Sequence, residues 1–179
     1  MNYLGVFSIV LAWAGLLFLI LRWPGNKSMT FSQHAAQKKE SRIFYRVLWT
    51  VATPIFTVFL LTNFKDKLDL NHVFNLLVLL ASCGMLIAAY VAEVGGIRSK
   101  IHRIAAFSMA ILFLPITLLI AASDNSSLFS KYFGAVSLMV LSIEVVILLI
   151  SKGYYRFMLP VQASYILIFH LMILVAYYF

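Results

Sequence analysis

The chain has 179 residues, of which 63% are hydrophobic and 11% are charged, and its formal net charge is +8. A soluble domain of this length cannot bury so much apolar surface, and a disordered chain has the opposite composition. The composition therefore predicts an integral membrane protein, and membrane spans occupy so much of the chain that no separate soluble domain is expected.

The apolar stretches predict six membrane spans. An α-helix needs about 20 apolar residues to cross the hydrocarbon core of a bilayer. Six stretches meet this requirement, at residues 3–22, 46–64, 73–94, 104–122, 133–151 and 157–178. The first has no basic start and no cleavage signature, so it is interpreted as a retained span and not as a signal peptide. We expect an all-α, polytopic membrane protein whose residues 1–179 form a single bundle of six transmembrane helices.

The polar connections carry the local signals. Thr30 and Gln33 have the spacing of a capping box, and residues 35–46 can then be helical, either as an interfacial helix or as an extension of the second span. A basic arm that binds lipid is the alternative for this segment. Residues 93–103 are expected to form a short basic loop, and Gly153 is expected to end the fifth helix.

The distribution of Lys and Arg predicts the orientation in the membrane. Three cations (Lys65, Lys67 and Lys131) flank one side of the predicted spans. Eleven flank the other side: Arg22, Lys27, Lys38, Lys39, Arg42, Arg46, Arg98, Lys100, Arg103, Lys152 and Arg156. The positive-inside rule places the eleven in the cytoplasm and both termini outside, and we expect a cell membrane, the inner membrane of a bacterium.

The same cations predict the partners. Because they lie in loops beside spans, they suit anionic lipid headgroups, and no nucleic acid is expected. Membrane lipids are the expected partners, with other membrane subunits as a further option. The only cysteine, Cys83, lies in an apolar run, so no intrachain disulfide can form.

Glu144 is the acidic residue placed deepest in a predicted span. An acid at a helix centre costs roughly 2.5–3.5 kcal/mol on insertion scales, and Ser137 and Ser151 share its helix face. A stripe of small and polar residues normally faces neighbouring helices. We therefore expect Glu144 to point into the bundle, protonated or hydrogen-bonded, either as a structural partner or as a functional acid. Its depth-matched candidate partners are Thr53, Gln162 and Tyr165.

Glu93 and His102 are the other candidates for a binding or acid-base role. Glu93 is expected at the cytoplasmic end of span three, on one face with Ser82. It is expected to pair weakly, in a partly solvated setting, with Arg98, Lys100 or His102. His102 and Glu93 are either boundary residues or functional ones, and the candidate headgroup-binding residues are Arg98, Lys100 and Arg103. His170 lies about 10 Å vertically from Glu144 and is expected to be a donor in helix packing.

Several kinds of site are not expected from the sequence. No His-Glu-x-x-His, phosphate-binding loop or dinucleotide glycine pattern occurs. The histidines do not pair at one depth, as a bis-histidine haem would require. No metal and no cofactor is therefore predicted, and no catalytic residue can be assigned.

One motif resembles a known family. The stretch Gly96-Ile97-Arg98-Ser99-Lys100-Ile101-His102-Arg103-Ile104-Ala105-Ala106-Phe107, followed by Leu114-Pro115, is similar to six-span membrane proteins of the domain of unknown function 998 family. In that family a histidine opens span four and is followed by small residues, a Phe and a mid-span Pro. The layout is more distantly similar to the Frag/DRAM/Sfk-like six-span proteins. The resemblance implies a six-span fold, and through the second group a link to lipid handling.

Three functions remain open from the sequence. The first is binding or moving a lipid or small amphiphile from a cytoplasm-facing polar cavity, because polar span residues gather in the inner half near the cations. The ligand-binding candidates are Glu144, Glu93, His102, Gln162, Tyr165 and Thr53. The second is a membrane-embedded enzyme that uses Glu and His as acid and base on a lipid-phase substrate. The third is a structural accessory subunit of a membrane complex, with polar residues that serve only helix packing.

Overall fold

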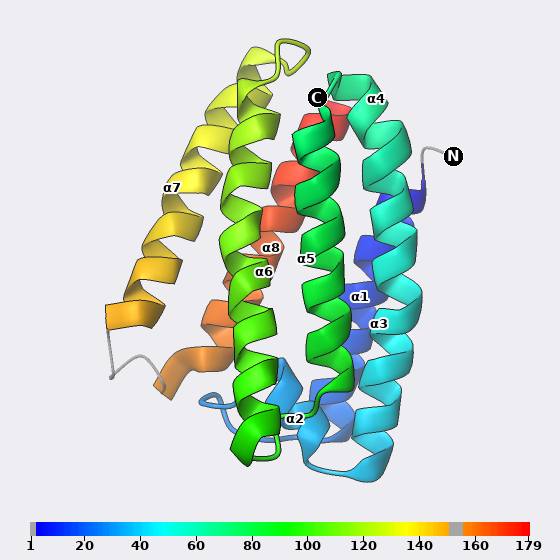
Figure 1. The fold of residues 1–179 in the computed structure, drawn as a ribbon, viewed down its shortest axis with the longest axis vertical. Coiled ribbons are helices and arrows are strands. Elements are labelled where there is room, and N and C mark those ends of the chain that lie inside the picture. Colours follow the sequence, from blue (N-terminus) through cyan, green and yellow to red (C-terminus); the bar gives the residue numbers. More distant parts are fainter. Residues whose placement is uncertain (1–2, 151–155) are drawn as a thin grey trace.

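The computed structural model describes residues 3–150 and 156–179, and within these ranges the chain is all-helical (Figure 1). Six helices are long and apolar enough to cross a membrane, which confirms the predicted all-α bundle and its six spans. The elements are α1 (Leu4–Arg22), α2 (Phe31–Ala36), α3 (Lys39–Phe59), η1 (Leu60–Phe64), α4 (Lys65–Leu68), α5 (His72–Tyr90), α6 (Gly96–Ala122), α7 (Leu128–Ile150) and α8 (Met158–Tyr178).

The long helices run roughly alongside one another. Around the bundle, the helices that pack against each other are α1 and α3, α3 and α5, α5 and α6, α6 and α7, and α7 and α8. Helix α8 also packs against α6 and α1, which closes the bundle. The start of α1, the end of α8 and α4 lie toward one end, and α2 lies at the other (Figure 1). We call these the α4 end and the α2 end.

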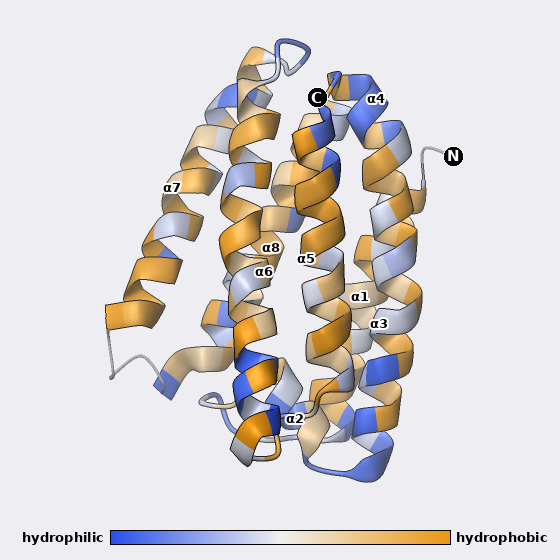
Figure 2. Cartoon of the chain, viewed as in Figure 1, coloured by the Kyte–Doolittle hydropathy of each residue, from blue (hydrophilic) through white to orange (hydrophobic). Residues whose placement is uncertain are grey.

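Large apolar side chains cover the outside of the bundle. Val51, Leu79 and Val146 are each about half exposed, at 45%, 47% and 49%, and the long helices carry apolar residues around most of their surface (Figure 2). A soluble protein rarely exposes contiguous apolar patches of this extent. The structure is that of an integral membrane protein whose outer surface faces lipid.

The second and fourth helices are longer than predicted. The second span was predicted at residues 46–64, with residues 35–46 as a helical extension in one of the two alternatives; α3 begins at Lys39 and continues through η1 and α4 to Leu68 as one 30-residue helix. The fourth was predicted from residue 104, but α6 begins at Gly96, so most of the predicted basic loop 93–103 is helical. Hydropathy marks where lipid begins, whereas Lys, Arg and Glu are themselves good helix formers and extend a helix past that boundary.

The third helix is shorter than predicted. It was expected to reach residue 94, but α5 ends at Tyr90, and Glu93 lies on the following connection. Gly95 and Gly96 have φ values of +97° and +59°, which L side chains rarely adopt, so the chain turns there into α6. Glu93 is therefore not on a helix face with Ser82. The predicted helix stop at Gly153 and the position of Ser151 lie outside the described residues.

The predicted capping box is confirmed at the start of α2. Thr30 Oγ1 accepts from the backbone N–H of Gln33, and the Gln33 side chain accepts from the backbone N–H of Thr30. The next N–H, that of Phe31, donates to Oε1 of Gln162 on α8 at 2.9 Å. For residues 35–46 the sequence allowed either a separate helix at the interface or an extension of the second span. The structure contains a separate short helix, α2, and also extends the second span, because α3 begins at Lys39.

Candidate functional site

A buried acid, Glu93, contacts both α2 and α6 at the α2 end. Glu93 Oε1 accepts from Arg103 Nε at 2.8 Å, and Glu93 Oε2 lies 3.3 Å from the Ser32 hydroxyl and 3.9 Å from His102 Nε2. The expected contact with at least one of Arg98, Lys100 or His102 is confirmed for His102. The closest cation, Arg103, was not among the three expected partners.

The environment of Glu93 differs from the partly solvated one that was expected. Its side chain is only 7% exposed, while that of Arg103 is 70% exposed. The helical start of α6 explains the choice of partner, because Arg103 lies one turn after Ser99, whose hydroxyl accepts from the backbone N–H of Gly95 in the connection that carries Glu93. Arg98 and Lys100 lie on the exposed face of the same helix.

His102 serves the end of α5. Its Nδ1 lies 2.9 Å from the carbonyl oxygens of both Ala88 and Val91, and its side chain is 5% exposed. The last carbonyls of a helix have no partner within the helix, so the imidazole N–H satisfies groups that would otherwise be buried without one. With Nδ1 as the donor, Nε2 faces Glu93 beyond hydrogen-bond distance.

Glu144 lies between α7 and α8, as expected. It is 9% exposed, and Ser137 on the same face is 2% exposed. Its Oε1 accepts from the Ser164 hydroxyl at 2.6 Å, and its Oε2 is buried with no hydrogen-bond partner among the described residues.

The depth-matched partners expected for Glu144 are not the ones it has. Gln162 serves the N-terminus of α2, and Tyr165 donates from its hydroxyl to the carbonyl oxygen of Ala110 at 2.6 Å. Thr53 lies at the centre of the bundle. Depth along a helix gives the height of a side chain but not its direction around the axis, so Ser164 was missed.

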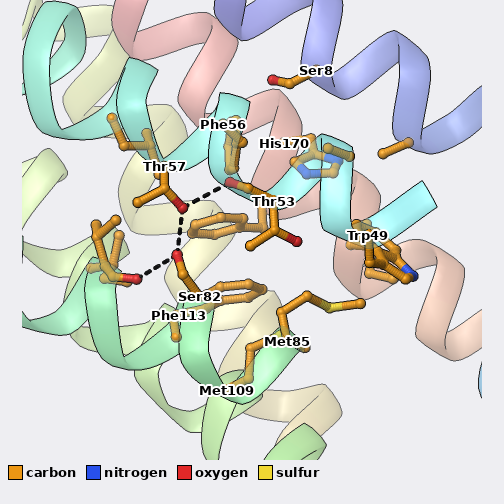
Figure 3. A pocket seen from close by; sticks show the side chains of 18 residues that line it. Ser8, Trp49, Thr53, Phe56, Thr57, Ser82, Met85, Met109, Phe113 and His170 are labelled. Atoms are coloured by element: carbon orange, nitrogen blue, oxygen red, sulfur yellow. Dashed lines mark hydrogen bonds between the residues drawn. The ribbon is translucent and has the colours of Figure 1, made fainter. Parts of the chain in front are cut away.

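A cavity of about 80 Å³ lies at the centre of the bundle (Figure 3). Residues of α1, α3, η1, α5, α6 and α8 line it, and most of them are apolar. Its polar lining residues are Ser8, Trp49, Thr53, Thr57, Ser82 and His170. Of the six predicted ligand-binding residues, only Thr53 lines this cavity, whereas His102 lines a second, much smaller hollow beside Ser32, Arg42 and Arg46.

His170 lines the central cavity and accepts a hydrogen bond from Trp13. The indole Nε1 of Trp13 donates to His170 Nδ1 at 3.1 Å, and Phe56 meets the imidazole edge-on at a centroid distance of 5.4 Å. The histidine was expected to be a donor in helix packing, but at Nδ1 it is the acceptor. Trp13 was missed because a tryptophan in an apolar span gives no sequence signal of a hydrogen bond.

Thr57 and Ser82 form a polar pair on the cavity wall. Their hydroxyl oxygens lie 2.6 Å apart, and they also contact the carbonyl oxygens of Thr53 and Val78, each at 2.8 Å. Two hydroxyl protons serve three contacts, so this pair needs no further acceptor.

The described residues bring no three His, Cys, Asp or Glu side chains together in a group that could hold a metal ion. No family model, curated protein or solved structure matches this chain. The similarity of the Gly96–Phe107 motif to the domain of unknown function 998 family therefore stays a prediction, and function has to be argued from the geometry.

Proposed function

We propose that this integral membrane protein binds a lipid or small amphiphile, and that the apolar part of the ligand enters the central cavity. The cavity is the observation that carries the proposal. Protein interiors are packed like organic crystals, and holes larger than a water molecule are few. An engineered apolar cavity of roughly 150 Å³ binds benzene, so about 80 Å³ suits a smaller group, such as the end of a chain.

The proposal moves the site from where the sequence placed it. A polar cavity near the cytoplasm was expected, with Glu144, Glu93 and Gln162 among its residues. In the structure Glu93 and Gln162 are engaged by Arg103 and by the backbone of α2. The central cavity is mostly apolar, which favours the hydrocarbon part of a ligand over its charged headgroup.

The surface charges at the α2 end complement such a ligand. Arg98 and Lys100 are exposed there, at the start of α6, where an anionic headgroup would lie. Arg103 has its Nε engaged by Glu93. The enzyme alternative has less support, because His102 is fixed to backbone carbonyls and its Nε2 lies 3.9 Å from Glu93.

We also propose that the α2 end faces the cytoplasm and that both termini lie outside, in the inner membrane of a bacterium. The support is the positive-inside rule applied to the eleven-to-three division of the cations. In a background with Cys83 replaced by Ser, a cysteine placed at exposed Gln37 should react with a membrane-impermeant maleimide only after the cells are opened. A cysteine at exposed Asn125 should react in intact cells. The reverse pattern would overturn this orientation.

Native mass spectrometry of the purified protein tests the proposed binding. The wild type should retain lipid or another amphiphile, and Ala52→Leu should lose it, because Ala52 lines the cavity and is 2% exposed. Val51→Leu is the matched control, since Val51 is the preceding residue of α3 and is 45% exposed. Equal retention by the wild type and both variants would show that the retained molecules lie on the outer surface, and the proposal would fail.

A further inference from the structure

Thr53 differs from the other threonines within helices. In a helix a threonine hydroxyl commonly bonds to the carbonyl oxygen four residues earlier. Four of the five do so here, at 2.7–2.8 Å: Thr50, Thr57, Thr62 and Thr117. The Thr53 hydroxyl instead has no hydrogen-bond partner among the described residues, although the residue is only 8% exposed.

The Thr53 hydroxyl is directed into the central cavity (Figure 3). A buried hydroxyl without a partner destabilises the fold, and a back-bond to its own helix would avoid that cost. The orientation therefore indicates that something in the cavity completes its hydrogen bonding.

His170 supplies a second donor on the same cavity. The indole of Trp13 can only donate, so the Nδ1 that receives its hydrogen bond must be unprotonated. The proton of the neutral imidazole is then on Nε2. Trp49 also lines the cavity, but Figure 3 shows its indole nitrogen at the end of the ring system remote from Thr53.

The cavity thus combines donors with apolar walls. The two hydroxyl protons of Thr57 and Ser82 already have acceptors in each other and in the carbonyl oxygens of Thr53 and Val78. Phe56, Met85 and Phe113 are among the apolar residues that form the rest of the wall. Among the described residues no Asp, Glu, Lys or Arg lines the cavity, so a charged group would have no counter-ion from them there.

We propose that the part of the ligand inside the cavity is uncharged and apolar and carries a carbonyl oxygen, which accepts hydrogen bonds from Thr53 Oγ1–H and His170 Nε2–H. The oxygen of a ketone, aldehyde or ester carbonyl has two lone pairs and no proton to donate, so it can accept from two donors. This inference rests on the proposed binding function and names its ligand class. A hydrocarbon of the same shape leaves both donors unpaired.

Two isosteric probes test the inference. Butanone and 2-methylbut-1-ene differ only in whether C=O or C=CH₂ occupies the same position. Each probe competes with dissolved xenon for the cavity. The ¹²⁹Xe chemical shift, measured on the protein in nanodiscs, reports how much xenon the probe displaces and so how much of the probe occupies the cavity. The filled-cavity variant Ala52→Leu supplies the background from the lipid.

Thr53→Val removes the hydroxyl and keeps the shape of the side chain. It should weaken butanone binding about three- to tenfold, the effect of one net hydrogen bond, and should not weaken 2-methylbut-1-ene. The infrared carbonyl band of ¹³C-labelled butanone should be shifted to lower frequency in the wild type, and part of this shift should be lost in Thr53→Val. Thr117→Val is the matched control, because Thr117 is fully buried, bonds back to Phe113 and does not line the cavity.

Thr53→Ser keeps the hydroxyl and should bind both probes as the wild type does. If Thr53→Val does not fold, His170→Phe tests the second donor, and it should likewise weaken only butanone. Saturable binding of both probes with no selective loss in either variant would overturn the carbonyl inference and leave the proposed function standing. Absence of saturable binding by both probes in the wild type would overturn both.

Discussion

His102 should matter for stability through the end of α5, and this role can be separated from an acid-base role. Its Nδ1–H is shared between the carbonyl oxygens of Ala88 and Val91, each 2.9 Å away. His102→Ala removes that donor from a site that is 4% exposed. Leaving a buried acceptor without its partner costs about 1–3 kcal/mol, and interhelical hydrogen bonds in membranes average about 0.6 kcal/mol in double-mutant cycles.

The lost packing of the ring adds to the lost hydrogen bond, so we expect His102→Ala to lower the free energy of unfolding by about 2–3 kcal/mol. His102→Asn places an amide N–H near the position of Nδ1 and should recover about 1 kcal/mol. His102→Gln places its amide nearer to Nε2, facing Glu93, and should recover less.

Unfolding by sodium dodecyl sulfate in mixed micelles, followed by circular dichroism, measures these differences. The control is His72→Ala at an exposed position of α5, which should change the unfolding free energy by less than about 0.5 kcal/mol. Equal loss in the Asn and Ala variants would refute the role of the donor, and a His102→Ala variant as stable as the control would refute the reasoning as a whole.

Two other sites give direct tests. Gly134→Ala should lower the unfolding free energy by about 1–3 kcal/mol, because the new Cβ would lie 2.7 Å from the Cβ of Ala121, a distance that forces α7 away from α6; an unchanged value would contradict this close packing. Glu144→Gln should keep the fold within about 0.5 kcal/mol in the same assay, since the amide oxygen can still accept from Ser164, whereas Glu144→Leu should lose about 1 kcal/mol. Dicyclohexylcarbodiimide reacts with protonated carboxyl groups in apolar surroundings. It should label Glu144 and spare Glu93, because Glu93 pairs with the cation of Arg103. Mass spectrometry of the labelled peptides measures this, and labelling of Glu93 alone would refute the prediction.

The spans could be predicted because lipid imposes one requirement on every crossing segment. Backbone groups in the hydrocarbon must bond within a helix, so a long apolar run has essentially one structure available. The ends were less predictable, as α3 and α6 show. Whether a helix continues past the lipid boundary depends on local helix formers and glycines, to which hydropathy does not respond.

The candidate site was predictable only in part, because a sequence gives depth more reliably than direction. Glu144 could be placed between helices from Ser137 on its own face, and both are buried. Its partner on α8 could not be chosen among Gln162, Ser164 and Tyr165, which lie within one turn. The central cavity had no sequence signal, because it results from how small side chains on several helices meet.

Most polar side chains within the bundle complete the hydrogen bonding of the backbone. Gln162 accepts from the first N–H of α2, His102 donates to the last carbonyls of α5, and Tyr165 donates to a carbonyl of α6. Such residues would be needed in any stable bundle, so they say little about activity. Thr53, Asn75 and Glu144 differ, because each keeps a buried oxygen without a partner among the described residues, and a fold alone gains nothing from that. Of these three, Thr53 alone lines the central cavity, and a bound molecule is therefore best sought beside Thr53.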